Sequence, residues 1–186
     1  RKNEIVLHKK LYEAINIPVI GRIINYGTVE GGDCLWINKN TLIVGESYRT
    51  NKEGIKQLHE ILKLLNIQLI PIQLPKNNNK DSCFHLMSII SMLDHDLAIG
   101  SEKLLPLDLK NILKKNGVEL LCIPEDEYFA SSTLAVNILA LSPRNLVTIQ
   151  GYPKTLELLL KSKCKINLFS GNELCIKAEG GPTCLT

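Results

Sequence analysis

The chain has 186 residues, of which 45% are hydrophobic and 22% are charged, a composition that is typical of a folded domain and excludes a disordered or collagen-like chain. Lysine and arginine total 22 against 19 acidic residues, and because these charges are scattered, the formal charge of +3 forms no basic stripe for nucleic acid. No apolar run approaches the roughly 18 residues that a membrane-spanning helix needs, so we expect neither nucleic acid nor a membrane as a partner.

The predicted elements, in chain order, begin with a helix and continue as a repeated unit. Residues 4–16 have the apolar spacing of an amphipathic helix, and a short strand is predicted at residues 18–20. Each later unit begins with two apolar strands joined by a hairpin turn, and the three strand pairs are predicted at 34–37 with 41–47, 86–93 with 96–102, and 136–141 with 145–151. A helix and a further strand complete each unit, and these last strands are predicted at 67–74, 118–123 and 165–169.

The helix of each unit has a recognisable start. Thr50 and Glu53 have the spacing of a capping box, which predicts that the first of these helices begins at Thr50. Pro106 and Pro153 are favoured first-turn residues and predict where the second and third helices begin. The strand-strand-helix-strand unit recurs about every 50 residues, so we predict an α/β repeat fold.

The sequence begins and ends within such a unit. Its first residue is Arg1 rather than Met, and a strand is predicted to start at Cys184, close to the last residue. We therefore expect one domain over residues 1–186 that lacks the N-terminal part of its set of modules.

The six cysteines form no Cys-x-x-Cys pair and no Cys/His cluster at zinc spacing. We expect no metal site and no cofactor, and because nothing marks the chain as secreted, we expect a reducing cytoplasm rather than a disulfide scaffold. Small buried hydrophobic side chains are predicted at four of the six positions, namely Cys34, Cys122, Cys164 and Cys175.

Three polar motifs lie at strand ends, where a radial repeat builds its site. Two glycines separate the carboxylates of Glu30-Gly-Gly-Asp33, a pattern that lets a backbone approach a ligand but also suits an ordinary surface turn. His85 opens a predicted apolar strand, where a histidine is more often a hydrogen-bonded core residue than a catalyst. Cys184 follows a glycine-rich turn that starts at Glu179, and a cysteine displayed in this way is a candidate nucleophile when a histidine is available.

Taken together and in this order, the motifs resemble the guanidino-group-modifying superfamily that includes dimethylargininases, arginine deiminases and amidinotransferases. The resemblance extends over residues 28–186 and rests on five segments: Glu30-Gly-Gly-Asp33, Val44-Gly-Glu-Ser-Tyr-Arg-Thr-Asn-Lys-Glu-Gly54, His85-Leu-Met-Ser88, Asn137-Ile-Leu-Ala-Leu141 and Gly180-Gly-Pro-Thr-Cys-Leu-Thr186. It implies the pentein fold, also called the α/β-propeller, in which five strand-strand-helix-strand modules surround a pseudo-fivefold axis.

The resemblance also implies a role for each motif residue. Cys184 is implied as the nucleophile, His85 as the general acid and base, and Glu30 as the carboxylate that binds the guanidinium. Arg49 is implied as the partner of the substrate α-carboxylate, since a guanidinium suits that bidentate contact better than an ammonium. Glu179 matches an acidic position near the nucleophile.

The implied reaction is hydrolysis of a C–N bond. A guanidinium delocalises its charge and is a poor electrophile, so it requires a thiolate nucleophile and protonation of the leaving nitrogen. Arginine or an N-methylated arginine would give a ureido product such as citrulline plus an amine or ammonia, through a covalent amidino-thioether. Asp33 is expected to brace its turn rather than to contact the substrate.

Met87 bears on the choice of substrate. Arginine deiminases typically have aspartate two residues after the catalytic histidine, and Met87 stands there instead, which favours an N-methylated substrate of the dimethylargininase type. Three alternatives stay open: an arginine deiminase, an amidinotransferase that excludes water until an acceptor amine enters, and a binding module like the ribosome-binding initiation factor of the same fold.

The combination of Glu30, His85 and Cys184 argues for an enzyme, because a binding module needs none of them. If Cys184 is not the nucleophile, Cys83 is the first alternative, since it lies next to His85 in the sequence. The expected partner is a small guanidino substrate, and the sequence leaves a homodimer open.

Overall fold

The computed structural model describes residues 2–75 and 84–185, and these contain three strand-strand-helix-strand modules, as the sequence predicts. The first module consists of β1 (Cys34–Asn38), β2 (Thr41–Glu46), α2 (Lys52–Lys63) and β3 (Gln68–Gln73). The second consists of β4 (Ile90–Met92), β5 (Leu97–Gly100), α3 (Leu107–Lys115) and β6 (Glu119–Cys122). The third consists of β7 (Leu139–Ser142), β8 (Asn145–Ile149), α5 (Pro153–Lys161) and β9 (Lys165–Phe169).

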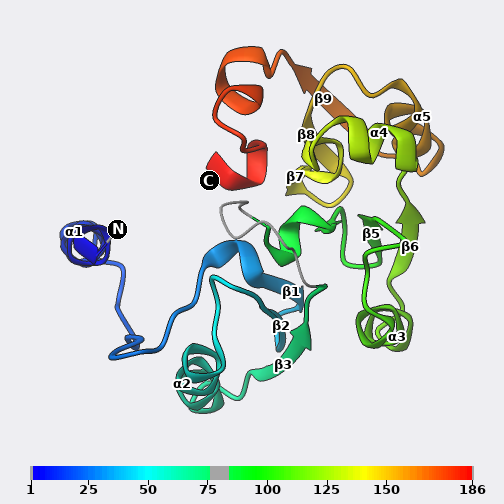
Figure 1. Ribbon diagram of the computed structural model, residues 1–186. Helices are drawn as coiled ribbons and strands as arrows, with labels where there is room; N and C mark the ends of the chain where they lie inside the picture. The colour runs from blue at the N-terminus through cyan, green and yellow to red at the C-terminus, as the bar shows by residue number, and fades with distance from the viewer. Residues whose placement is uncertain (1, 76–83, 186) are drawn as a thin grey trace.

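All three modules have the same sheet topology. The first two strands pair antiparallel through a tight hairpin, and the third strand lies parallel to the second. A parallel pair needs a crossover connection, which the helix of each module supplies. Figure 1 shows the modules following one another along an arc, with α2, α3 and α5 on its outer side.

Apolar side chains shared between neighbours join the modules. Ile43 of the first module and Leu86, which precedes the second, belong to one buried cluster, and Ile99 of the second module shares another with Leu146 of the third. Residues 41–45 and 97–100 are buried without interruption, because β2 and β5 are covered on both faces. This packing fixes the strands of neighbouring modules relative to one another.

The helix starts are close to those predicted. α5 begins at Pro153, and α3 begins directly after Pro106. The prediction that Thr50 caps α2 is wrong by one residue: Asn51 is the cap, and its Oδ1 accepts a hydrogen bond from Gly54 N at 2.8 Å. The buried hydroxyl of Thr50 instead accepts a hydrogen bond from the backbone of the Glu30 turn.

Short 3-10 turns replace several of the expected strand residues. η2 (Leu86–Ser88) and η3 (Leu134–Val136) delay the starts of β4 and β7, so His85 precedes a turn and does not open a strand. The strand expected from Cys184 is the 3-10 turn η5 (Pro182–Leu185), where Pro182 has no N–H to give to a sheet.

Two further expectations about elements are corrected. Residues 18–20 form no strand, because no other described strand pairs with them. α4 (Glu125–Ala130) was not predicted, although Pro124 and the acidic residues 125–127 are a helix-start signal.

The cysteines expected to be buried differ in exposure. Cys164 and Cys175 are buried and Cys34 is partly buried, in line with the prediction. Cys122 is exposed, so the prediction is wrong there, because the alternation along β6 turns its side chain to the solvent face.

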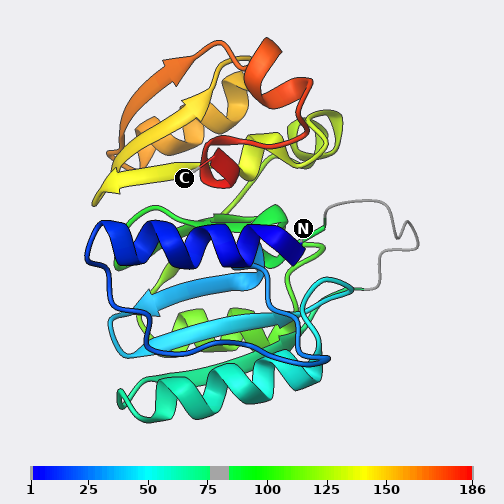
Figure 2. The same ribbon diagram turned by 90° about the vertical axis from the view of Figure 1, so that its left-hand side faces the viewer.

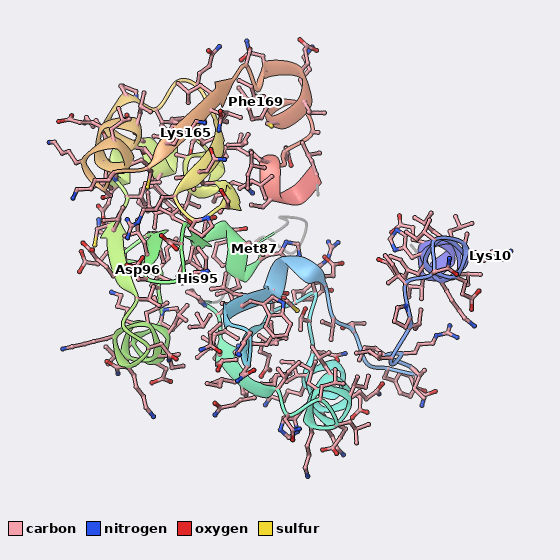
Figure 3. The ribbon with its side chains drawn as sticks, turned by 180° about the vertical axis from the view of Figure 1, so that it is seen from behind. Lys10, Met87, His95, Asp96, Lys165 and Phe169 are labelled. Atoms are coloured by element: carbon pink, nitrogen blue, oxygen red, sulfur yellow. The ribbon has the colours of Figure 1, made fainter. Side chains whose placement is uncertain are left out.

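The helix α1 (Lys2–Ala14) lies apart from the modules. Figure 1 shows it separated from their strands, Figure 2 shows it running across the front of the molecule, and Figure 3 labels Lys10 on it. Its apolar side chains are largely exposed, with Leu7 at 62% and Leu11 at 53%. Neither α1 nor any other helix in ranges 2–75 and 84–185 has the length and apolar character to cross a membrane.

Candidate active site

Asp33 fixes the turn that presents Glu30. It is fully buried in η1 (Gly31–Asp33), where its Oδ2 accepts a hydrogen bond from Ser47 Oγ at 2.6 Å and its Oδ1 accepts one from Leu86 N at 2.9 Å. The first contact ties the turn to the end of β2, and the second ties it to η2. These contacts confirm the prediction that Asp33 braces its turn.

The backbone of η1 packs directly against the ring of His85. A Cβ atom added to Gly32 would lie 2.7 Å from both Cγ and Nδ1 of His85, which is too close for any side chain. A Cβ on Gly31 would meet nothing within 4 Å. The second glycine of the motif is therefore required by its approach to the histidine.

Glu30, His85 and Arg49 form one hydrogen-bonded cluster at these turns. Glu30 Oε2 lies 2.8 Å from His85 Nε2, and Glu30 Oε1 lies 2.9 Å from both Nε and Nη2 of Arg49. The structure thus unites three of the predicted site residues, although His85 is 55 positions from Glu30 in the sequence. Both carboxylate oxygens of Glu30 have a partner.

The charge of Glu30 is stabilised by these partners. Burial by itself would raise the pKa of Glu30, but the hydrogen bonds and charges of Arg49 and His85 outweigh it and hold this pKa below its usual value. An ionised carboxylate only accepts hydrogen bonds, so Nε2 of His85 carries the proton in this contact. The other side of the ring accepts a hydrogen bond from the backbone N–H of Ser88, so the imidazole is held between Glu30 and η2.

Cys184 lies on η5, and its thiol is hydrogen-bonded to the side chain of Asn137. Asn137 Nδ2 lies 3.2 Å from Cys184 Sγ, while Asn137 Oδ1 accepts hydrogen bonds from Thr183 N at 2.9 Å and Thr183 Oγ1 at 2.8 Å. The cysteine is exposed. Burial raises the pKa of the neighbouring Cys175, and the charge at Cys184 raises it further.

The other predicted site residues differ in position and in burial. Figures 1 and 2 show the C-terminal turn η5 on the same inner side of the arc as η1 and η2, and Figure 3 shows Met87 on η2 at the middle of the arc. Met87 is partly buried. Glu179 is exposed, has a left-handed backbone with φ 55°, and forms no ion pair with another described residue. Cys83 lies outside the described residues.

Sequence reasoning missed the part that Asn137 plays. It is a polar side chain with only 7% exposure within a predicted apolar strand, and such a residue needs internal hydrogen-bond partners. That mismatch was the available signal. Within residues 2–75 and 84–185, no group of three or more His, Cys, Asp or Glu side chains could hold a metal ion.

Comparison with known proteins defines the family. The sequence model for arginine deiminase matches residues 5–106, more than half of the chain. The chain belongs to the arginine deiminase family. This confirms the resemblance of its motifs to the guanidino-group-modifying superfamily.

Two relatives of this arginine deiminase family chain have different enzyme names. It is 28% identical over 169 residues to N(G),N(G)-dimethylarginine dimethylaminohydrolase of Pseudomonas aeruginosa, an alignment that covers 90% of this chain and 58% of the relative. It is also 28% identical over 191 residues to arginine deiminase of Mycoplasma capricolum, with 86% and 46% covered. The chain thus spans about half the length of the curated relatives it matches.

Solved structures confirm the pentein fold of this arginine deiminase family member. The Pseudomonas aeruginosa dimethylarginine dimethylaminohydrolase complexed with citrulline has a TM-score of 0.74 at 23% identity and covers 94% of this chain and 63% of its own. An inosamine-phosphate amidinotransferase from Streptomyces griseus has a TM-score of 0.62 at 17% identity, with 82% and 44% covered.

Proposed function

We propose that this chain is part of a cysteine-dependent hydrolase that cleaves a C–N bond in the guanidinium of arginine or an N-methylated arginine. The observation that carries the proposal is the 2.8 Å contact between Glu30 Oε2 and His85 Nε2, in a cluster completed by Arg49. An anionic carboxylate on one ring nitrogen fixes the tautomer and the orientation of the imidazole. The names of the relatives support the same class of reaction.

In the proposed mechanism, the thiolate of Cys184 attacks the central guanidinium carbon and forms a C–S bond. The C–N bond then breaks, and the departing amine or ammonia takes a proton from His85. Water attacks the resulting amidino-thioether and gives a proton to His85, after which the C–S bond breaks, releases the ureido product and restores the thiolate. Each step uses only groups of this chain, the substrate and water.

We propose a more specific role for Glu30 than contact with substrate alone. Its Oε1 is engaged by Arg49 and its Oε2 by His85, so in this state the carboxylate orients His85. Binding of the substrate guanidinium by Glu30 would require Arg49 to leave Oε1. A released Arg49 would then be available for the α-carboxylate of an amino-acid substrate, as the family resemblance implies.

Met87 supports an N-methylated substrate within this proposal. A thioether offers polarizable apolar contact to an N-methyl group but leaves one N–H of unsubstituted arginine without a strong acceptor, at a cost of about 1–3 kcal/mol. This corresponds to roughly ten- to hundredfold discrimination. We therefore propose a dimethylargininase type of activity with citrulline as the ureido product.

The test is a citrulline assay on the complete protein with arginine, monomethylarginine and dimethylarginine. N-methylated substrates should have the higher kcat/KM, and Met87→Asp should narrow or reverse that preference. Cys184→Ser should abolish turnover, whereas Cys122→Ser, which changes an exposed cysteine on β6, should retain it. Equal rates on all substrates that Met87→Asp leaves unchanged would refute the methylarginine preference.

Two outcomes would point to the alternatives. Product that forms only when an acceptor amine is added would identify an amidinotransferase, because that reaction excludes water from the same intermediate. Full turnover in Cys184→Ser would remove the proposed nucleophile and the cysteine mechanism with it.

A further inference from the structure

Asn137 connects the third module to the turn that carries Cys184. It directly follows η3, and only 7% of it is exposed. Among the residues that the structure describes, its two amide atoms make three hydrogen bonds, all with η5: Nδ2 with Cys184 Sγ at 3.2 Å, and Oδ1 with Thr183 N at 2.9 Å and Thr183 Oγ1 at 2.8 Å. Both polar atoms of this buried amide are thus hydrogen-bonded to Thr183 and Cys184.

The orientation of this amide follows from its partners. A backbone N–H can only donate, so the atom of Asn137 that faces Thr183 N must be the carbonyl oxygen. The NH₂ group therefore faces Cys184 Sγ and donates to it. A donor directed at sulfur stabilises a thiolate more than a thiol, because hydrogen bonds to an ionised group are the stronger ones.

Gly181 makes this contact sterically feasible. A Cβ atom on Gly181 would lie 2.3 Å from Cγ and 2.4 Å from Oδ1 of Asn137, so any side chain there would push η5 away from the amide. The backbone of Cys184 is in turn linked to Gly181, since Cys184 N donates to Gly181 O at 3.0 Å. Gly181 therefore packs against the Asn137 amide and is hydrogen-bonded to Cys184, so the three residues hold one another in place.

We infer that Asn137 is a positioning residue that holds η5 through its carbonyl oxygen and stabilises the thiolate of Cys184 through its NH₂ group. The inference deepens the proposed function and rests on it, because it assigns a role toward the proposed nucleophile. Two titratable groups of the C-terminal segment lie near Cys184 in the sequence: the exposed Glu179, and Cys175, a buried thiol whose own pKa is raised by burial and by the charge at Cys184.

Alkylation of the Cys184-containing peptide as a function of pH, quantified by mass spectrometry with iodoacetamide as the probe, tests this inference without requiring turnover. Asn137→Asp keeps an acceptor for both Thr183 contacts but removes the donor to sulfur and places an anionic acceptor there. The midpoint of the alkylation curve should rise, and the rate at neutral pH should fall by roughly ten- to hundredfold, the effect of losing a hydrogen bond to a charged group.

Thr183→Val is the matched control, because it removes the contact to Oδ1 from the hydroxyl and leaves the donor to sulfur in place. It should lower the melting temperature without moving the midpoint of alkylation. Asn137→Ser, whose hydroxyl is too short to reach sulfur, should behave like Asn137→Asp and serves if the aspartate variant does not fold.

An unchanged midpoint in a folded Asn137→Asp or Asn137→Ser variant, with only a lower melting temperature, would overturn the inference and leave Asn137 a structural residue. Failure of the proposed function has a different signature, namely continued turnover in Cys184→Ser. A shifted midpoint together with such turnover would support the positioning of the cysteine and reject its role as nucleophile.

Discussion

Replacing Asp33 removes the buried link between the turn of Glu30 and the segment of His85. The carboxylate accepts one hydrogen bond from Ser47 Oγ at 2.6 Å and one from Leu86 N at 2.9 Å. Asp33 and Leu86 are both fully buried, so water cannot readily take over these contacts in Asp33→Ala. Ser47 Oγ also accepts hydrogen bonds from the backbone N–H groups of residues 49 and 50. A shift of the Ser47 side chain in Asp33→Ala would therefore also disturb the backbone at Arg49.

The expected loss of stability follows from these contacts. A buried donor left without an acceptor costs about 1–3 kcal/mol, and the Leu86 N–H is such a donor, while the partly buried Ser47 hydroxyl loses its acceptor at a smaller cost. We expect Asp33→Ala to lower the free energy of unfolding by about 2–4 kcal/mol in total, a large effect for a single substitution. Because Asp33 and Ser47 contact each other, the double variant Asp33→Ala/Ser47→Ala should lose at least about 0.5 kcal/mol less than the two single losses combined.

Urea denaturation measures these free energies, and the single tryptophan, Trp36 on β1, reports the transition by fluorescence. Glu119→Gln, which changes an exposed carboxylate on β6, is the control and should leave the midpoint nearly unchanged. A loss below about 1 kcal/mol in Asp33→Ala would refute the proposed bracing role. Additivity of the two single losses would refute the coupling through Ser47.

Three further predictions concern other parts of the structure. Glu127→Ala should lower the free energy of unfolding by about 1.5–3 kcal/mol in urea denaturation, because this buried carboxylate accepts three hydrogen bonds at the start of α5. Asp126→Asn, which changes an exposed ion pair, should produce no measurable loss. Equal losses in the two variants would contradict this prediction. Gly181→Ala should reduce turnover and melting temperature, because a Cβ at residue 181 would lie 2.3 Å from the buried amide of Asn137. Gly31→Ala should change neither quantity, because a Cβ at residue 31 would meet no atom within 4 Å. Similar melting curves for the two variants would contradict the packing at Gly181. The free energy of unfolding should fall as the pH drops from about 4.5 through the lowered folded-state pKa of Glu30, because protonation removes a charge that is stabilised only in the folded state. Glu30→Gln should remove that part of the pH dependence of the melting temperature. Identical acid profiles in the two proteins would show that Glu30 does not contribute.

Much of the fold could be predicted because its signals are local. The apolar runs on either side of the turn at residues 38–40 predict the β1–β2 hairpin, and Pro153 predicts the start of α5. Thr50 and Asn51 are both good capping residues, and a tertiary contact from the Glu30 turn, which local sequence does not reveal, decides between them. The apolar residues 18–20 likewise looked like a strand, but a strand exists only with a partner.

The candidate site was predictable by resemblance more than by spacing. Nothing in the sequence alone brings Glu30 next to His85, because hydrogen bonding across 55 positions depends on how two modules pack. The resemblance supplied both residues, and the structure adds the braces that hold them, Asp33 and the approach of Gly32. Asn137 stood within the matched motif but had no assigned role, since its contacts to η5 exist only in the folded chain.

Mass spectrometry of the acid-quenched complete protein, after brief incubation with dimethylarginine, tests the central claim most directly. We predict an added amidino group on the peptide that contains Cys184, which appears before citrulline accumulates and is absent from Cys184→Ser. Citrulline formation without any adduct on Cys184, or with an adduct on another cysteine such as Cys83, would contradict the assignment of Cys184 as the nucleophile.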